Sequence, residues 1–184
     1  MTKFNFKLKF WLIVALQILI LFSLLAYNQY RLIVGEKILL KLTPPPDPLA
    51  LFQGHYLALN YEISELNANE YIGPSNLEPG ETVYVLLYKK GGYYRAFGVS
   101  REKPKEGIFI KGKVISNYRG DLEIRYGIEN YFIPEKKANE IEREFRKLIR
   151  EKSENLFVQV SLDREGNALI TKLLAGRKEI DLES

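Results

Sequence analysis

The stretch Phe10–Ala26 reads FWLIVALQILILFSLLA and sets the architecture, because it contains 17 residues without a single charge. At about 1.5 Å per residue, a helix of this length spans roughly 25 Å, close to the about 30 Å of a hydrocarbon core. Trp11 near one end, and Tyr27 and Tyr30 beyond the other, are typical of the headgroup level. The sequence therefore predicts a single transmembrane helix within residues 1–33.

The charges that flank this stretch predict its orientation. Only Arg31 follows it before Lys37, whereas three lysines precede it within nine residues, namely Lys3, Lys7 and Lys9. Because cytoplasmic flanks carry the excess of Lys and Arg, we expect the N-terminus in the cytoplasm and the rest of the chain outside the cell membrane.

A cleaved secretory signal peptide is the alternative interpretation of the N-terminus. Its apolar core is usually about 7–15 residues long and ends at a small-x-small cleavage site. Ala26 fits the last position before a cut, but Leu24 occupies the other small position. The sequence favours an uncleaved signal anchor.

The remainder of the chain is neutral and free of cysteine. The formal net charge is +4, yet residues 1–31 contain no acid, and from residue 32 onward 23 Lys and Arg accompany 23 Asp and Glu. A nucleic-acid binder needs a net basic face, so we expect no nucleic-acid partner. The absence of cysteine excludes disulfides, thiolate metal sites and a cysteine nucleophile.

Residues 34–184 predict one β-rich domain outside the cytoplasm. Apolar alternation and turn residues such as Gly91-Gly92 predict strands at 35–42, 55–63, 82–88, 93–100, 108–116, 122–126, 156–162, 168–174 and 178–182. Residues 64–80 read as a loop, residues 49–53 as a short helical turn, and Pro44–Pro48 as a stiff connection.

One amphipathic helix is predicted after Pro134, since four apolar residues recur there at helical spacing: Ile141, Phe145, Leu148 and Ile149. The predicted fold class is α+β, mainly β. It comprises the membrane helix and a small twisted antiparallel sheet, or a partly open barrel, of about eight strands. The amphipathic helix would cover an open side or edge.

The stretch Gly54–Tyr61 reads GHYLALNY and resembles the motif of the GDYXXLXY family, with His55 where that family has Asp. Three further segments also look like that family: Pro46-Asp47-Pro48, residues 125–135 (RYGIENYFIPE), and residues 158–174 with Asp163 and Gly166. The resemblance covers roughly residues 34–182. It implies a membrane-anchored bacterial or archaeal protein with a polytopic membrane-protein partner, and it implies no particular reaction.

The motif and the 125–135 segment supply the candidate binding residues Gly54, His55, Tyr56, Tyr61, Tyr126, Glu129 and Tyr131. By strand parity Tyr56 and Tyr61 point to opposite faces, so at least one of them is expected in the core. A second candidate surface combines tyrosines with arginines, namely Tyr93, Tyr94, Tyr118, Tyr126 and Tyr131 with Arg95, Arg119 and Arg125. Ordinary cross-strand packing is the alternative for both sets.

No complete catalytic or metal site is visible in the sequence. His55 is the only histidine, and neither a His-x-x-x-His pair nor an Asp-rich loop is present, so we assign no catalytic residue, metal or cofactor. A serine–lysine hydrolase resembling signal peptidases would have to draw on Ser64, Ser100 or Ser116 with Lys103, Lys111 or Lys113. These lysines read as solvated outer-face residues.

Three functions follow as expectations. The first is a non-enzymatic accessory domain at the outer membrane surface that binds a membrane protein or an envelope component. The second is the membrane-anchored serine–lysine hydrolase. The third is a domain that binds a small ligand, a sugar or peptide, in a pocket lined by tyrosines.

Overall fold

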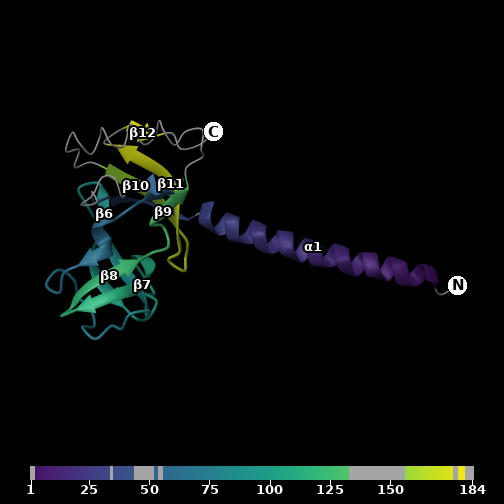
Figure 1. Cartoon of the computed structure of the whole chain (residues 1–184), viewed down its shortest axis with the longest axis horizontal. Coiled ribbons are helices and arrows are strands. Elements are labelled where there is room, and N and C mark those ends of the chain that lie inside the picture. Colours follow the sequence, from purple (N-terminus) through teal and green to yellow (C-terminus); the bar gives the residue numbers. More distant parts are fainter. Residues whose placement is uncertain are drawn as a thin grey trace.

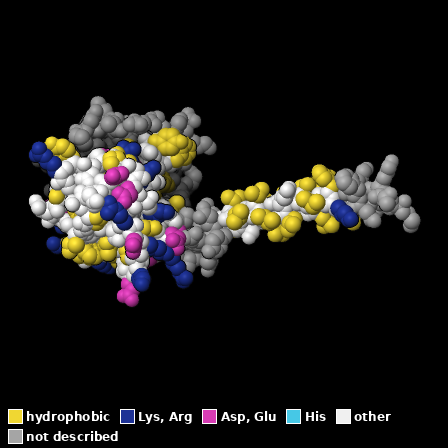
Figure 2. Space-filling view, turned by 90° about the horizontal axis from the view of Figure 1, so that it is seen from below, with side chains coloured by type: hydrophobic (Ala, Val, Ile, Leu, Met, Phe, Trp, Pro, Cys, Tyr) yellow, Lys and Arg dark blue, Asp and Glu magenta, His cyan; other side chains and the backbone are white. Residues whose placement is uncertain are grey.

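The computed structural model describes residues 3–33, 35–43, 52–53, 56–132, 156–175 and 178–180. Its first element is helix α1 (Lys3–Ile33), which projects from the β-rich domain as a single rod (Figure 1). Within it, Leu8–Ala26 has 19 residues, a mean hydropathy of 2.4 and no part buried against the rest of the protein. Figure 2 shows hydrophobic side chains along this rod. The predicted N-terminal apolar helix is confirmed, and it is long enough to cross a membrane.

The strands follow α1 in chain order. They are β1 (Glu36–Lys41), β2 (Phe52–Gln53), β3 (Tyr56–Ala58), β4 (Glu65–Leu66), β5 (Thr82–Lys90), β6 (Tyr93–Ser100), β7 (Ile108–Tyr118), β8 (Asp121–Arg125), β9 (Asn130–Phe132), β10 (Leu156–Leu162), β11 (Ala168–Ala175) and β12 (Lys178–Ile180). Among the described residues, nine of them form one sheet in the order β12-β11-β10-β1-β6-β5-β7-β8-β4, and β2-β3-β9 form a second. The predicted mainly β fold is confirmed.

The large sheet is mixed rather than wholly antiparallel. β1 runs antiparallel to β10 through six register pairs, but it runs parallel to β6, which it meets at Leu40 and Tyr94. The sheet also curls. The Lys111 amide of β7 donates to the Gly166 carbonyl in the β10–β11 turn at 2.8 Å. Strands distant in the sheet order therefore approach each other, as in a partly open barrel.

The core lies inside this curl. Alternate residues of β5 point inward, and Val83, Val85 and Leu87 are at most 5% exposed. Burying side chains of this size contributes about 1.5–3 kcal/mol each. Gly112 of β7 leaves room for a core ring, since an added Cβ would lie 3.0 Å from the Tyr126 ring.

Several local predictions differ from the structure. The strand expected over 55–63 ends at Ala58 and is followed by a 3-10 helix, η1 (Glu62–Ser64). Phe52–Gln53, expected in a helical turn, forms strand β2. The expected loop 64–80 contains strand β4, which pairs with β8. In β4 the exposed Glu65 is followed by the buried Leu66, whose side chain joins the core. The sequence also missed β9. The amphipathic helix after Pro134, the proline stretch Pro44–Pro48, Gly54 and His55 lie outside the described residues.

Candidate functional site

Tyr61, the last residue of the family motif, is a core residue. Its side chain is 1% exposed, and its hydroxyl donates to the Ile128 carbonyl oxygen at 2.6 Å. Burial is the main cause that raises the pKa of the Tyr61 hydroxyl, and the negative charge of Glu129 adds to it. The hydroxyl therefore stays protonated and acts as a hydrogen-bond donor, not as a base.

Tyr126 makes the reciprocal contact. It is 7% exposed, and its hydroxyl donates to the carbonyl oxygen of Ile63. Burial and the charge of Glu129 raise its pKa in the same way. Each of the two tyrosines thus ties the segment around residue 61 to the segment around residue 127.

Glu129 completes this arrangement from the backbone side. Its carboxylate accepts hydrogen bonds from the backbone amides of Tyr126 and Gly127, and Gly127 has a φ of +81°. Its carbonyl accepts from the Leu59 amide at 2.7 Å. Hydrogen bonds to an ionised carboxylate are among the stronger ones in proteins. We call Tyr61, Tyr126 and Glu129 the tyrosine cluster. Its hydrogen bonds hold the segment 59–63 against the segment 126–129, which is a structural role.

Tyr56, the first tyrosine of the motif, faces the other way. It is 51% exposed and pairs across β3 and β9 with Phe132, which is 56% exposed. The two ring centroids lie 5.6 Å apart in a T-shaped arrangement. The preceding residue of β9, Tyr131, lies opposite Leu57, is partly buried and packs against the core. The prediction that Tyr56 and Tyr61 point to opposite sides, with at least one in the core, is confirmed.

The other tyrosines and arginines are spread over several surroundings. Tyr94 packs against the core, whereas the Tyr93 ring contacts the Phe157 ring at a tilt of 48°, with the centroids 5.5 Å apart. Tyr118 is 68% exposed and lies beneath the guanidinium of Arg119. The predicted tyrosine–arginine surface is therefore not one patch.

None of the three candidate serines bonds a lysine in the part of the chain that the structure describes. Ser100 Oγ donates to the Glu102 carbonyl at 2.8 Å, and Ser116 Oγ donates to the Glu123 carboxylate at 3.4 Å. Ser64 Oγ is buried and has no partner in the described part of the chain. Lys103 pairs with Glu165 at 2.7 Å, and Lys111 and Lys113 are exposed, as expected for outer-face residues.

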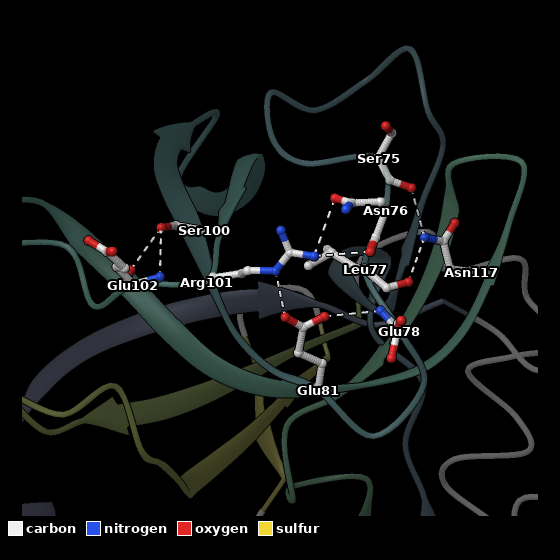
Figure 3. Close-up of polar contacts among 9 residues, drawn as sticks. All are labelled: Ser75, Asn76, Leu77, Glu78, Glu81, Ser100, Arg101, Glu102 and Asn117. Atoms are coloured by element: carbon white, nitrogen blue, oxygen red, sulfur yellow. Dashed lines mark hydrogen bonds and ion pairs between the residues drawn. The ribbon is translucent and has the colours of Figure 1, made fainter.

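A polar network holds the loop before β5 against the sheet (Figure 3). Arg101 bonds the Glu81 carboxylate through Nε and the Asn76 carbonyl through Nη2, the latter at 3.0 Å. From the other side, the Asn117 amide donates to the carbonyls of Ser75 and Leu77. The hydrogen bond from Arg101 is the first cause that lowers the pKa of Glu81, followed by the backbone amide of Glu78.

A pocket of about 270 Å³ lies beside η1, and the sequence did not predict it. Four of its eight lining residues are charged, and the others are apolar or aromatic: Glu62, Glu65, Glu70 and Arg95, with Ile63, Leu66, Tyr88 and Ala96. Arg95 Nε lies 2.6 Å from Glu62 Oε1, and the charge of Glu62 raises the pKa of Arg95. Of the tyrosines that the structure describes, only Tyr88 lines this pocket. Within the described residues, no group of three or more His, Cys, Asp or Glu side chains could hold a metal ion.

An apolar N-terminal helix, a curled β domain and one buried motif tyrosine, Tyr61, together fit a membrane-anchored domain of the kind that the sequence resemblance implied. A family model described as GDYXXLXY protein matches residues 17–173, so the chain belongs to the GDYXXLXY family. No curated protein and no solved structure is detectably similar to it.

Proposed function

We propose that this chain is a membrane-anchored, non-enzymatic accessory protein whose domain lies outside the cytoplasm. There it binds a polytopic membrane-protein partner or another envelope component through the exposed Tyr56–Phe132 pair. The observation that carries the proposal is that the two motif tyrosines differ in exposure: Tyr61 is buried in the core, and Tyr56 is exposed at the surface.

The aromatic pair has the properties of an interaction anchor. Tyr56 and Phe132 are each about half exposed, and their rings already contact each other edge to face. Aromatic side chains bury large areas with little loss of conformational freedom, and tyrosine is enriched among the residues that dominate interfaces. The tyrosine cluster also fixes strand β3, which carries Tyr56. One residue after this strand, the Leu59 amide donates to the Glu129 carbonyl.

The orientation rests on the flanking charges Lys3, Lys7 and Lys9. It can be tested directly because the native chain has no cysteine. Single cysteines at Thr2 and at Glu102 would be labelled in intact cells with a membrane-impermeant maleimide. We expect labelling at position 102 alone; labelling at position 2 alone would reverse the topology.

The contact surface is tested by a photoreactive phenylalanine analogue in place of Tyr56 in the full chain in its native membrane. We expect a crosslink to one protein, identified by mass spectrometry, at much higher yield than from the same analogue at Phe97. Phe97 is a matched control, since it is an aromatic residue 40% exposed on β6. Equal yields at the two positions, or crosslinks to lipid alone, would refute the proposal that the Tyr56–Phe132 pair contacts a partner protein.

A further inference from the structure

The tip of the β7–β8 hairpin carries backbone strain. Tyr118 and Asp121 close a two-residue turn made of Arg119 and Gly120, with φ values of +56° and +93°. Among the described residues, Arg119 is the only one besides glycine with a positive φ. Glycine or asparagine is preferred in such a turn, so an arginine here is costly for folding alone, and strain of this kind concentrates at functional sites.

The tip is held rigidly, and its side chains face solvent. The Tyr71 hydroxyl donates to the Gly120 carbonyl at 2.9 Å, and the Ala68 amide donates to Asp121 Oδ1 at 2.9 Å. Tyr118 is nevertheless 68% exposed, and the Arg119 guanidinium lies 5.2 Å from its ring centroid. None of the ion pairs in the described part of the chain uses Arg119, so its positive charge has no carboxylate partner there.

The pocket beside η1 carries the opposite charge in excess. Glu62 is paired with Arg95 and lies 3.8 Å from Lys41, whereas the Glu70 carboxylate accepts only the Asn67 side-chain amide, at 3.0 Å, among the described residues. The Glu65 carboxylate takes part in none of the ion pairs or side-chain hydrogen bonds of the described residues, and Glu65 lies opposite Glu123 in the β4–β8 register. Like charges placed across a strand pair repel, so a cation entering this pocket would relieve that repulsion.

The tip and the pocket are neighbours on one surface. The 67–70 turn separates them: Ala68 contacts Gly120 and bonds Asp121, while Glu70 lines the pocket. Two identical surfaces that each carry a projection next to its complement can join about a two-fold axis, which makes both contacts at once. Copies anchored by α1 in one membrane share an orientation, which leaves an axis normal to the membrane available.

We propose that two copies of this chain associate through these features, with Tyr118 and Arg119 of each copy inserted into the acidic pocket of the other. The guanidinium reaches Glu65 and Glu70, and the Tyr118 ring packs beside Tyr88 and Leu66. This surface is separate from the Tyr56–Phe132 pair, so self-association and binding of another protein succeed or fail independently.

The test uses the full chain in membranes that contain equal amounts of unlabelled and ¹⁵N-labelled protein. The unlabelled copy carries a photoreactive phenylalanine analogue at Tyr118, and mass spectrometry locates each crosslink and its isotope. We expect crosslinks to residues 62–70 or 88–96 of the labelled copy. Crosslinks confined to the same copy, or made to a different protein, would overturn the proposal.

Charge reversal supplies the second arm. Arg119→Glu in both copies should lower the yield of intermolecular crosslinks by more than about tenfold, since like charges at an interface are strongly unfavourable. Combining it with Glu65→Lys and Glu70→Lys should restore the yield. Arg164→Glu, at an exposed position in the β10–β11 turn, serves as the control and should leave the yield unchanged. An unchanged yield with Arg119→Glu, with the fold verified by circular dichroism, would refute the contact.

Discussion

Replacing Tyr61 with phenylalanine tests the tyrosine cluster, because it removes one oxygen and keeps the ring. The lost interaction is the 2.6 Å hydrogen bond to the Ile128 carbonyl, and Tyr61 is 1% exposed, so water cannot take the place of the hydroxyl. A buried carbonyl left without its donor costs about 1–3 kcal/mol of the free energy of unfolding. For a chain of this size that corresponds to a fall in Tm of roughly 2–12 °C.

The assay is unfolding of the full chain in detergent micelles, followed by near-ultraviolet circular dichroism of the tyrosines. Fluorescence of Trp11 would not report on the domain, because Trp11 lies in α1. The control is Tyr118→Phe, which alters a residue 68% exposed and should change stability by less than about 0.5 kcal/mol. If Tyr61→Phe proved as stable as Tyr118→Phe, Tyr61 would not hold the two segments together.

A double-mutant cycle extends this test to Tyr126. The hydroxyls of Tyr61 and Tyr126 join the same two segments in opposite directions. The loss in the free energy of unfolding on removing both hydroxyls should therefore differ from the sum of the two single losses by at least about 0.5 kcal/mol. Strict additivity would mean that the two hydrogen bonds act independently.

Three further predictions concern the domain's stability. Above about pH 10 the unfolded chain releases tyrosine protons that folded Tyr61 and Tyr126 retain, because both pKa values are raised. Stability present below pH 10 should then fall by about 1.4 kcal/mol per pH unit for each tyrosine, and Tyr61→Phe should make alkaline unfolding curves less steep. Gly35→Ala should destabilise the domain by about 1–3 kcal/mol in urea unfolding, since the new Cβ would overlap the Leu162 carbonyl. Ser161→Ala should be neutral or stabilising in the same assay, because Ser161 Oγ is buried without a partner in the described residues; a loss above 1 kcal/mol, about the worth of a hydrogen bond, would reveal one.

The long strands could be predicted because their sequences alternate strongly. β10 was predicted with its observed bounds, and β6 likewise, since Val158, Val160 and their neighbours mark one face and turn residues mark the ends. The parallel contact of β1 with β6 could not be predicted, because it joins residues 54 positions apart, Leu40 and Tyr94, after several intervening strands. Local patterns contain no information on such pairings.

In the candidate site too, local features could be predicted from the sequence, and contacts between distant residues could not. Parity placed Tyr56 and Tyr61 on opposite sides, although the strand between them ends early. The partners of the tyrosine cluster lie 67 and 63 residues away along the chain, so no spacing rule could indicate them. The acidic pocket was missed for a similar reason. Glu62 fell in the predicted strand 55–63, whereas Glu65 and Glu70 fell in the predicted loop 64–80. The opposite wall comes from Tyr88 of β5 and Arg95 of β6, which are distant in sequence.

The entry of α1 into β1 also determines how the protein bears mechanical load. β1 lies inside the sheet order, between β10 and β6, and is joined to β10 by six register pairs from Glu36 to Lys41. Force on α1 enters the domain at the start of β1, and its component along this strand loads the hydrogen bonds of the ladder in shear, so that they share that component. Strands peeled from a sheet edge instead break their bonds one after another. The domain should therefore resist extraction of its helix better than a domain tethered through an edge strand.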